Sequence, residues 1–255
     1  MFHLAAFRSD LAISASYAQL AAVADAALTR NAANQYIMPA NMRVIGAHAQ
    51  GLTISRAQIQ APSLRMIAFP EIYPTIIGAL TAVPDQQGFC DYADYGPRLL
   101  QNEAVGVYGS NSSGVATSPT VAALMITERR IPAPQGMATT IVATTTNTTV
   151  LDNWSLSTLT FETQLAAGEY AVVGMVAIAD NSSYARLVFP GASNIRPGVP
   201  VLDTYGEKQW HDNFRNGRYG LFGRFPFNNP PQLELFGSVA AATPATILLD
   251  VVKVM

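Results

Sequence analysis

This chain of 255 residues contains few charged side chains. Only 13% of the residues are Asp, Glu, Lys or Arg, and just two are lysines, Lys208 and Lys253. An ordinary soluble domain carries about 25% charged residues. The cores of protein interfaces are depleted in Lys, Glu and Asp. We therefore expect much of the surface to be covered by other subunits.

Several other absences exclude whole classes of protein. The single cysteine, Cys90, cannot form an intramolecular disulfide, so the chain is not a disulfide-stapled scaffold. No stretch is long and apolar enough to predict a transmembrane helix. The only adjacent basic pair is Arg129-Arg130, which argues against a surface built for nucleic acid. Phosphate-cradling glycine loops are also missing.

The first 40 residues predict a helical arm. Ser9 or Asp10 could cap a helix, and the alanines that follow favour one. Apolar residues then recur at spacings of three and four, which is typical of one helix face: Ile13, Tyr17, Leu20, Val23, Ala24, Ala27 and Leu28.

From about Met42 to residue 255, β-branched and alternating runs separated by turn residues predict a body of many short strands, a sandwich or barrel. Two half-domains would fit the length, but no linker of distinct composition separates them. The predicted strands are Arg43–Ala49, Leu52–Gln60, Leu64–Phe69, Thr75–Val83, Ala104–Tyr108, Val121–Glu128, Thr139–Thr145, Leu156–Thr163, Tyr170–Ala179, Tyr184–Phe189, Tyr219–Phe225, Gln232–Val239 and Thr246–Val254.

Loops and turns are the second signal in this body. Asn216-Gly217 predicts a type I′ hairpin turn, because both residues tolerate positive φ. Long loops, which often carry contacts or function, are predicted at Pro84–Pro97, Ser110–Pro119 and Pro190–Asn213.

Catalytic and metal-binding patterns are weak. The three histidines are scattered, and His211 beside Asp212 is the only pairing of a histidine with a neighbouring carboxylate. Asp91 and Asp94 could supply oxygen ligands to calcium, but the spacing of a helix-loop-helix calcium site is missing. We therefore expect no catalytic residue, cofactor or metal, and the possibility of a structural calcium near Asp91 and Asp94 stays open.

The segment from Trp210 to Phe227 concentrates aromatic residues and arginines. The leading interpretation is a hairpin whose aromatics fill the core. A protein interface comes second, since Tyr, Trp and Arg are the usual hot spots, and single-stranded nucleic acid comes third. As interface residues we predict Tyr17, Leu20, Trp210, Phe214, Arg218 and Tyr219.

Taken together, an N-terminal arm, a β-rich body with long loops and a low charge resemble the jelly-roll capsid proteins of non-enveloped icosahedral viruses and phages. The C-terminal run from Thr246 to Val254 would suit a buried closing strand. Many such proteins carry a basic arm for the genome, whereas residues 1–40 here contain only Arg8 and Arg30.

The resemblance implies an antiparallel jelly-roll-like β-sandwich, residues 41–255, behind an α-helical arm, residues 1–40. It implies a structural, non-enzymatic subunit of the virion that self-assembles with copies of itself and other capsid proteins. Specific nucleic-acid binding is not expected, and an inner layer or membrane could lie against the shell.

Two alternatives remain open at this stage. One is a β-sandwich module that binds carbohydrate or another ligand and stacks it on Tyr92, Tyr95, Trp210 and Tyr219. The other is an enzyme on a β scaffold that uses His211, Asp212, Asp91 and Asp94.

Overall fold

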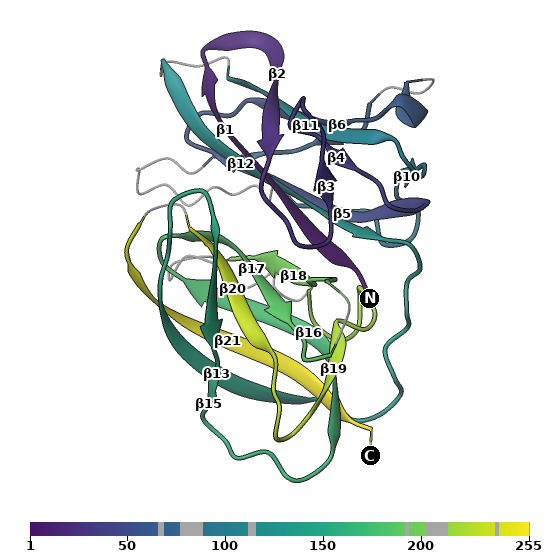
Figure 1. Ribbon diagram of the computed structural model, residues 1–255, viewed down its shortest axis with the longest axis vertical. Helices are drawn as coiled ribbons and strands as arrows, with labels where there is room; N and C mark the ends of the chain where they lie inside the picture. Colours follow the sequence, from purple (N-terminus) through teal and green to yellow (C-terminus); the bar gives the residue numbers. More distant parts are fainter. Residues whose placement is uncertain are drawn as a thin grey trace. The chain divides into compact units, whose positions relative to one another are not determined.

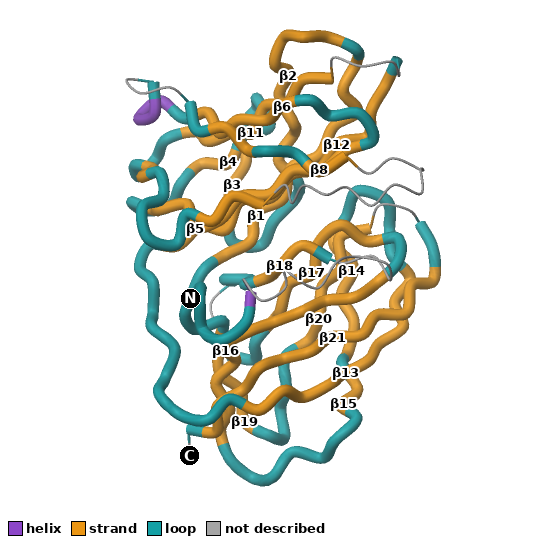
Figure 2. Tube along the Cα trace, turned by 180° about the vertical axis from the view of Figure 1, so that it is seen from behind, coloured by secondary structure: helices purple, strands orange, loops and turns teal. Residues whose placement is uncertain are grey.

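The computed structural model describes residues 1–65, 69–76, 89–111, 116–191, 194–201, 214–237 and 240–254. Contacts divide the chain into two compact units, and unit 2 is one continuous stretch, Ala5–Glu128. Unit 1 combines Met1–Leu4 with Arg129–Met255. Strands dominate both units, as Figure 2 shows. Their pairing is mainly antiparallel.

Unit 2 contains eight principal strands among its described residues, and Figure 1 labels six of them, β1, β2, β5, β6, β11 and β12. In chain order they are β1 (His3–Ala12), β2 (Ser14–Ala22), β5 (Met42–Gly51), β6 (Arg56–Gln60), β7 (Glu71–Ile72), β9 (Phe89–Asp91), β11 (Ala104–Asn111) and β12 (Thr117–Thr127). Hydrogen bonding gives the order β1-β12-β5-β9 on one side and β2-β11-β6-β7 on the other. Pairing of β1 with β2, through Phe7 and Ala22, joins the two sets. Short additions are β3 (Thr29–Arg30), β4 (Tyr36–Ile37), β8 (Thr75–Ile76), β10 (Arg98–Leu99) and the 3-10 turn η1 (Pro62–Leu64).

Unit 1 also has eight principal strands in the part that the structure describes. They are β13 (Thr139–Thr148), β14 (Trp154–Thr158), β16 (Glu169–Ala179), β17 (Ser182–Val188), β18 (Gly198–Pro200), β19 (Gly223–Pro226), β20 (Gln232–Gly237) and β21 (Ala242–Lys253). One sheet runs β13-β21-β16-β19, extended by β15 (Thr160–Phe161), and the other runs β14-β20-β17-β18.

The two units have the same strand connectivity. In each, the first, eighth, third and sixth principal strands form one sheet, and the second, seventh, fourth and fifth form the other. This is the strand order of the jelly roll, a double sheet built from two Greek keys. The chain therefore holds two jelly rolls in succession, and β1 begins with two residues of unit 1 before it enters unit 2.

The predicted N-terminal α-helical arm is wrong. Residues 1–40 contain β1 to β4, and no α-helix occurs within the described ranges. Leu20 and Ala22 are buried on one face of β2, whereas Ile13 is 54% exposed, so the proposed stripe is split. Ser9, expected as a helix cap, instead accepts a hydrogen bond from the Ala21 amide at 3.1 Å. Helix propensity is a weak preference, and pairing with β1 and β11 outweighs it.

The cores lie between the paired sheets of each roll. In unit 1, Ile141, Leu249 and Met175 form one row across three neighbouring strands, and each is buried. In unit 2, the Phe7 and Tyr36 rings meet edge to face at 5.1 Å. The Tyr36 hydroxyl donates to the carbonyls of Ala6 and Val23, which satisfies a buried polar group.

The predicted Asn216-Gly217 turn is present, but it does not join two strands. Asn216 and Gly217 have φ of 55° and 72°, and the Arg218 amide donates to the Arg215 carbonyl at 3.2 Å. The Gly217 amide donates to the Val173 carbonyl of β16 at 2.8 Å, so the turn is fastened to the sheet.

Most other predicted strands have counterparts, from β5 to β21. In the predicted strand Leu64–Phe69, Leu64 closes η1 and residues 66–68 lie outside the described residues. The same holds for residues 77–83 of Thr75–Val83, for Val239, and for parts of all three predicted loops.

Candidate functional site

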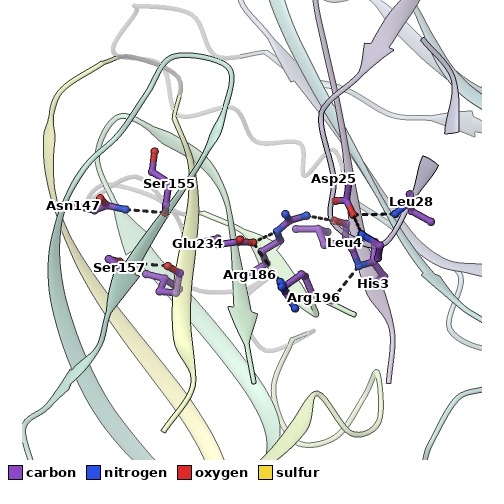
Figure 3. Close-up of polar contacts among 12 residues, drawn as sticks. His3, Leu4, Asp25, Leu28, Asn147, Ser155, Ser157, Arg186, Arg196 and Glu234 are labelled. Atoms are coloured by element: carbon purple, nitrogen blue, oxygen red, sulfur yellow. Dashed lines mark hydrogen bonds and ion pairs between the residues drawn. The ribbon is translucent and has the colours of Figure 1, made fainter. Parts of the chain in front are cut away.

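A buried arginine is the centre of the first polar cluster in unit 1. Arg186 lies on β17 with its side chain 2% exposed, and its Nε donates to a carboxylate oxygen of Glu234 on the neighbouring β20. Its guanidinium carbon lies 3.8 Å from the centroid of the Trp154 ring, a cation–π contact. Figure 3 shows Arg186 and Glu234 pointing toward one another. The arrangement satisfies a buried charge, as burial demands.

The first residues of the chain join this cluster (Figure 3). Arg186 Nη1 lies 3.4 Å from the Leu4 carbonyl that accepts its hydrogen bond, and the Leu4 amide donates to the Arg196 carbonyl at 2.9 Å. The Arg196 amide donates to Nδ1 of His3 at 3.0 Å. Phe2 is 1% exposed and packs edge to face on Phe222 at 4.8 Å. Residues 2–4 are therefore built into unit 1 by both backbone and side-chain contacts.

A second cluster joins the turn after residue 213 to the last strand. Arg215 donates to both carboxylate oxygens of Asp250, at 2.9 and 2.7 Å, and to Oγ1 of Thr140 at 2.7 Å. Thr140 also donates to Asp250 at 2.7 Å. Burial alone would raise the pKa of Asp250, but hydrogen bonds from Arg215 and Thr140, together with the guanidinium charge, hold that pKa below its ordinary value. Asp250 is therefore an ionised partner in a bidentate pair.

A third cluster lies on unit 2 around Tyr17. The Tyr17 hydroxyl is 2.8 Å from both carboxylate oxygens of Glu71, and Arg56 binds the same carboxylate at 3.0 Å. The Arg56 guanidinium also lies over the Tyr17 ring, 5.3 Å from its centroid. Burial, followed by the hydrogen bond and charge of Glu71, raises the pKa of Tyr17 to about 12. Tyr17 is thus a neutral donor at physiological pH.

The predicted interface residues fall into three groups. Leu20, Phe214 and Tyr219 are buried within their own units, and the Phe214 and Tyr219 rings stack at 5.6 Å. Tyr17 and Arg218 reach the surface. Trp210 lies outside the described residues. Three of the six are therefore core residues of the described chain, and the interface itself stays a prediction.

The described residues of the alternative functions differ in exposure. Tyr95 is 97% exposed, Tyr219 is 2% exposed, and the Tyr92 hydroxyl donates to the Glu71 carbonyl at 3.1 Å. Burial, more than the neighbouring Cys90, raises the pKa of Tyr92 above its ordinary range. His211 and Asp212, like Trp210, lie outside the described residues.

The candidate calcium ligands Asp91 and Asp94 lie at the end of β9 and three residues beyond it. Asp91 accepts a hydrogen bond from the Ala93 amide at 2.9 Å, and the Asp94 carbonyl is 3.5 Å from Arg43. Within the described ranges, no three His, Cys, Asp or Glu side chains gather as metal ligands. Cys90 is half-buried, with its sulfur 3.8 Å from the Glu71 carbonyl.

His48 lies on β5 with its side chain buried. Burial lowers the pKa of His48 to about 3, so the imidazole stays neutral at ordinary pH. It is paired across the sheet with Ala123 and Phe89. A neutral core histidine is the interpretation that these surroundings support.

The pairs Arg186–Glu234 and Arg215–Asp250 were not predicted, because 48 and 35 residues separate their members. A usable signal does exist. Arg186 stands in Tyr-Ala-Arg-Leu-Val and Asp250 in Leu-Leu-Asp-Val-Val, each a lone charge inside an apolar strand. Charges in such positions are rarely buried without a partner.

Comparison with known proteins gives little. No family model matches the chain, and no curated protein matches it. Among solved structures, the chain is similar to the major capsid protein P2 from bacteriophage PM2, at 8% identity over 97% of this chain and 98% of that one, with a TM-score of 0.22. A likeness at this level carries no argument about function. No helix in the described part of the chain is long and apolar enough to cross a membrane.

Proposed function

We propose that this protein is a structural subunit of a viral or phage capsid shell and that it acts by self-assembly. The observation that carries the proposal is the pair of jelly rolls wired alike in one chain. Jelly rolls serve as shell-forming domains in viral capsids, although lectins and cupins also use them. Because a fold alone does not fix a function, the chemistry of the surface must agree.

The surface does agree with assembly. The chain is poor in charge, and several of its charges are paired within the described structure, as in Arg186–Glu234 and Arg215–Asp250. With a formal net charge of -2, little electrostatic repulsion keeps an isolated subunit apart from its copies. The proposal places the protein in the virion, with copies of itself and other capsid proteins as partners and no enzymatic role.

The test is the native mass of the purified chain by light scattering, with electron micrographs of the same sample. We expect closed particles or defined trimers, pentamers or hexamers. A monodisperse monomer at high protein concentration would contradict the proposal and would favour a ligand-binding module.

A further inference from the structure

One sheet of unit 1 presents an apolar outer face. Side chains alternate across a strand, and the core row of Ile141, Leu249 and Met175 fixes which residues point inward. The register then places two outward rows across β13, β21 and β16. We call these six residues the valine–threonine face: Val142, Leu248 and Val176 in one row, and Thr144, Thr246 and Ile178 in the next.

These side chains are in part accessible. Val176 is 8% exposed, and the other five are half-buried. An open groove runs along the threonine row and continues past Thr146 and Pro244, both of which are exposed. Antiparallel sheets that face water normally show polar residues on their outer side, so this face departs from the solvent-facing pattern.

Charge lies at the edges of this outer surface. From Thr140 to Thr146 on β13, Pro244 to Asp250 on β21 and Gly174 to Ile178 on β16, the only outward ionisable side chain is Asp250. Its carboxylate is taken up by the bidentate pair with Arg215. Two exposed carboxylates border these rows: Asp180 lines the same groove, and Glu162 follows β15, with its amide bonded to the Val142 carbonyl. Within the rows themselves no unpaired charge opposes contact with another apolar surface, and Asp180 and Glu162 would lie at the polar rim of such a contact.

An outer sheet face in unit 2 shows the contrast. There the register aligns Gln19, Tyr108, Gln58 and Glu71 across β2, β11, β6 and β7. The Tyr108 hydroxyl donates to Gln19 at 3.1 Å, and Glu71 binds Tyr17 and Arg56. That face is a polar network suited to water. Two units with the same strand connectivity thus have outer sheet faces of different polarity, because different side chains point outward.

The size of the valine–threonine face decides how strongly it can bind. Strand spacing of about 4.8 Å and a rise of about 3.3 Å per residue give roughly 300 Å² for three strands of seven residues. A stable interface takes about 800 Å² from each partner. One such contact is therefore weak on its own, and repetition over many subunits would make it effective.

We propose that the valine–threonine face packs against a second copy of this chain, an inference that rests on the proposed self-assembly. A second copy brings surface of the same low charge, and sheets packed face to face at about 10 Å need apolar, interdigitating side chains. A face whose centre carries no unpaired charge suits this partner better than an acidic or basic one.

The first experiment places a charge in the face. Leu248→Glu is compared with Leu156→Glu, because Leu156 is 53% exposed on β14 of the other sheet and offers the same substitution elsewhere. Self-association is measured by light scattering and sedimentation, after circular dichroism shows that both variants are folded. We expect Leu248→Glu to weaken association by about 100-fold, because the carboxylate would be buried unpaired, and Leu156→Glu to leave it within about threefold of wild type.

A second measurement does not depend on how Leu248→Glu folds. In a Cys90→Ser background, Thr246→Cys and the exposed control Thr158→Cys are labelled with a maleimide, in assembled and in dissociated samples. The Thr246→Cys thiol should react at least about tenfold more slowly after assembly, while the Thr158→Cys rate stays unchanged.

The outcomes separate the two proposals. If wild type assembles but both Glu variants behave alike and Thr246→Cys stays reactive, the valine–threonine face is not the contact, and the capsid proposal stands. If wild type remains a monomer under all conditions, both proposals fail. Protection of Thr246→Cys that appears only after a different protein is added would overturn the second copy as the occupant.

Discussion

Phe2 gives the sharpest test of how the chain is put together, because it is at the start of the sequence and belongs to unit 1. Its side chain is 1% exposed, and the centroid of its ring lies 4.8 Å from that of Phe222 and 6.4 Å from that of Tyr219. Truncation of a buried Phe to Ala typically costs 3–5 kcal/mol. We expect Phe2→Ala to lower the free energy of unfolding by about 3 kcal/mol.

That loss converts into a measurable change in melting temperature. Unfolding entropy of about 2.1 cal/mol/K per residue, over the roughly 130 residues of unit 1, gives a decrease in Tm of about 10 °C. The assay is calorimetry of the unfolding transition that includes unit 1. Phe2→Leu retains most of the apolar volume and should cost no more than about 1.5 kcal/mol.

Phe227→Ala is the matched control, since Phe227 is 43% exposed in the same unit. Its Tm should fall by no more than about 2 °C. A Tm for Phe2→Ala equal to that of Phe227→Ala would refute the placement of residues 1–4 in unit 1.

Three further predictions concern the outer side of β16 and the turn fastened to it. Asp250→Asn should lower the free energy of unfolding at pH 7 by about 2 kcal/mol in urea titrations, less than for a fully buried pair, because water reaches the 32%-exposed Arg215. Because the folded-state pKa of Asp250 is lowered, its contribution is present above the unfolded-state pKa and is lost as pH falls through the folded-state pKa, so the two proteins should converge in acid. Gly174→Ala should cost about 2 kcal/mol in the same titration, since an added Cβ would lie 2.6 Å from an Asp250 oxygen and 2.8 Å from the Arg215 Cα; a neutral result would contradict this packing. Gly217→Ala should cost at least about 1 kcal/mol by thermal melting, because φ is +72° and the new Cβ would meet Ala133 at 2.8 Å; an unchanged Tm would mean that the turn is not held as described.

Local pattern was enough to predict most strands. The β-branched run at Tyr170–Ala179 matches β16, and the run at Thr246–Val254 lies largely within β21. The β-sandwich part of the fold prediction therefore holds. The prediction of an N-terminal helix failed because the alanine-rich sequence fits both a helical and a strand periodicity. Leu20, for example, fits both the apolar stripe of a helix and the alternation of β2.

Local sequence patterns could not predict the strand connectivity or the polar clusters. β13 pairs with β21, about a hundred residues further along the chain, and no local spacing encodes that choice. The same applies to Tyr17, whose partner Glu71 is 54 residues away. Prediction of such pairs requires the topology first.

The route of the chain sets an order for folding during synthesis. Unit 2 occupies one continuous stretch, Ala5–Glu128, so every residue it needs has been synthesised before β13. Domains generally fold as units, N-terminal first. Phe2 and Leu4 must wait until Phe222 and Glu234 have been translated before their own roll can close around them. A segment fused directly to residue 1 would therefore interfere with the folding of unit 1, most of which is translated last.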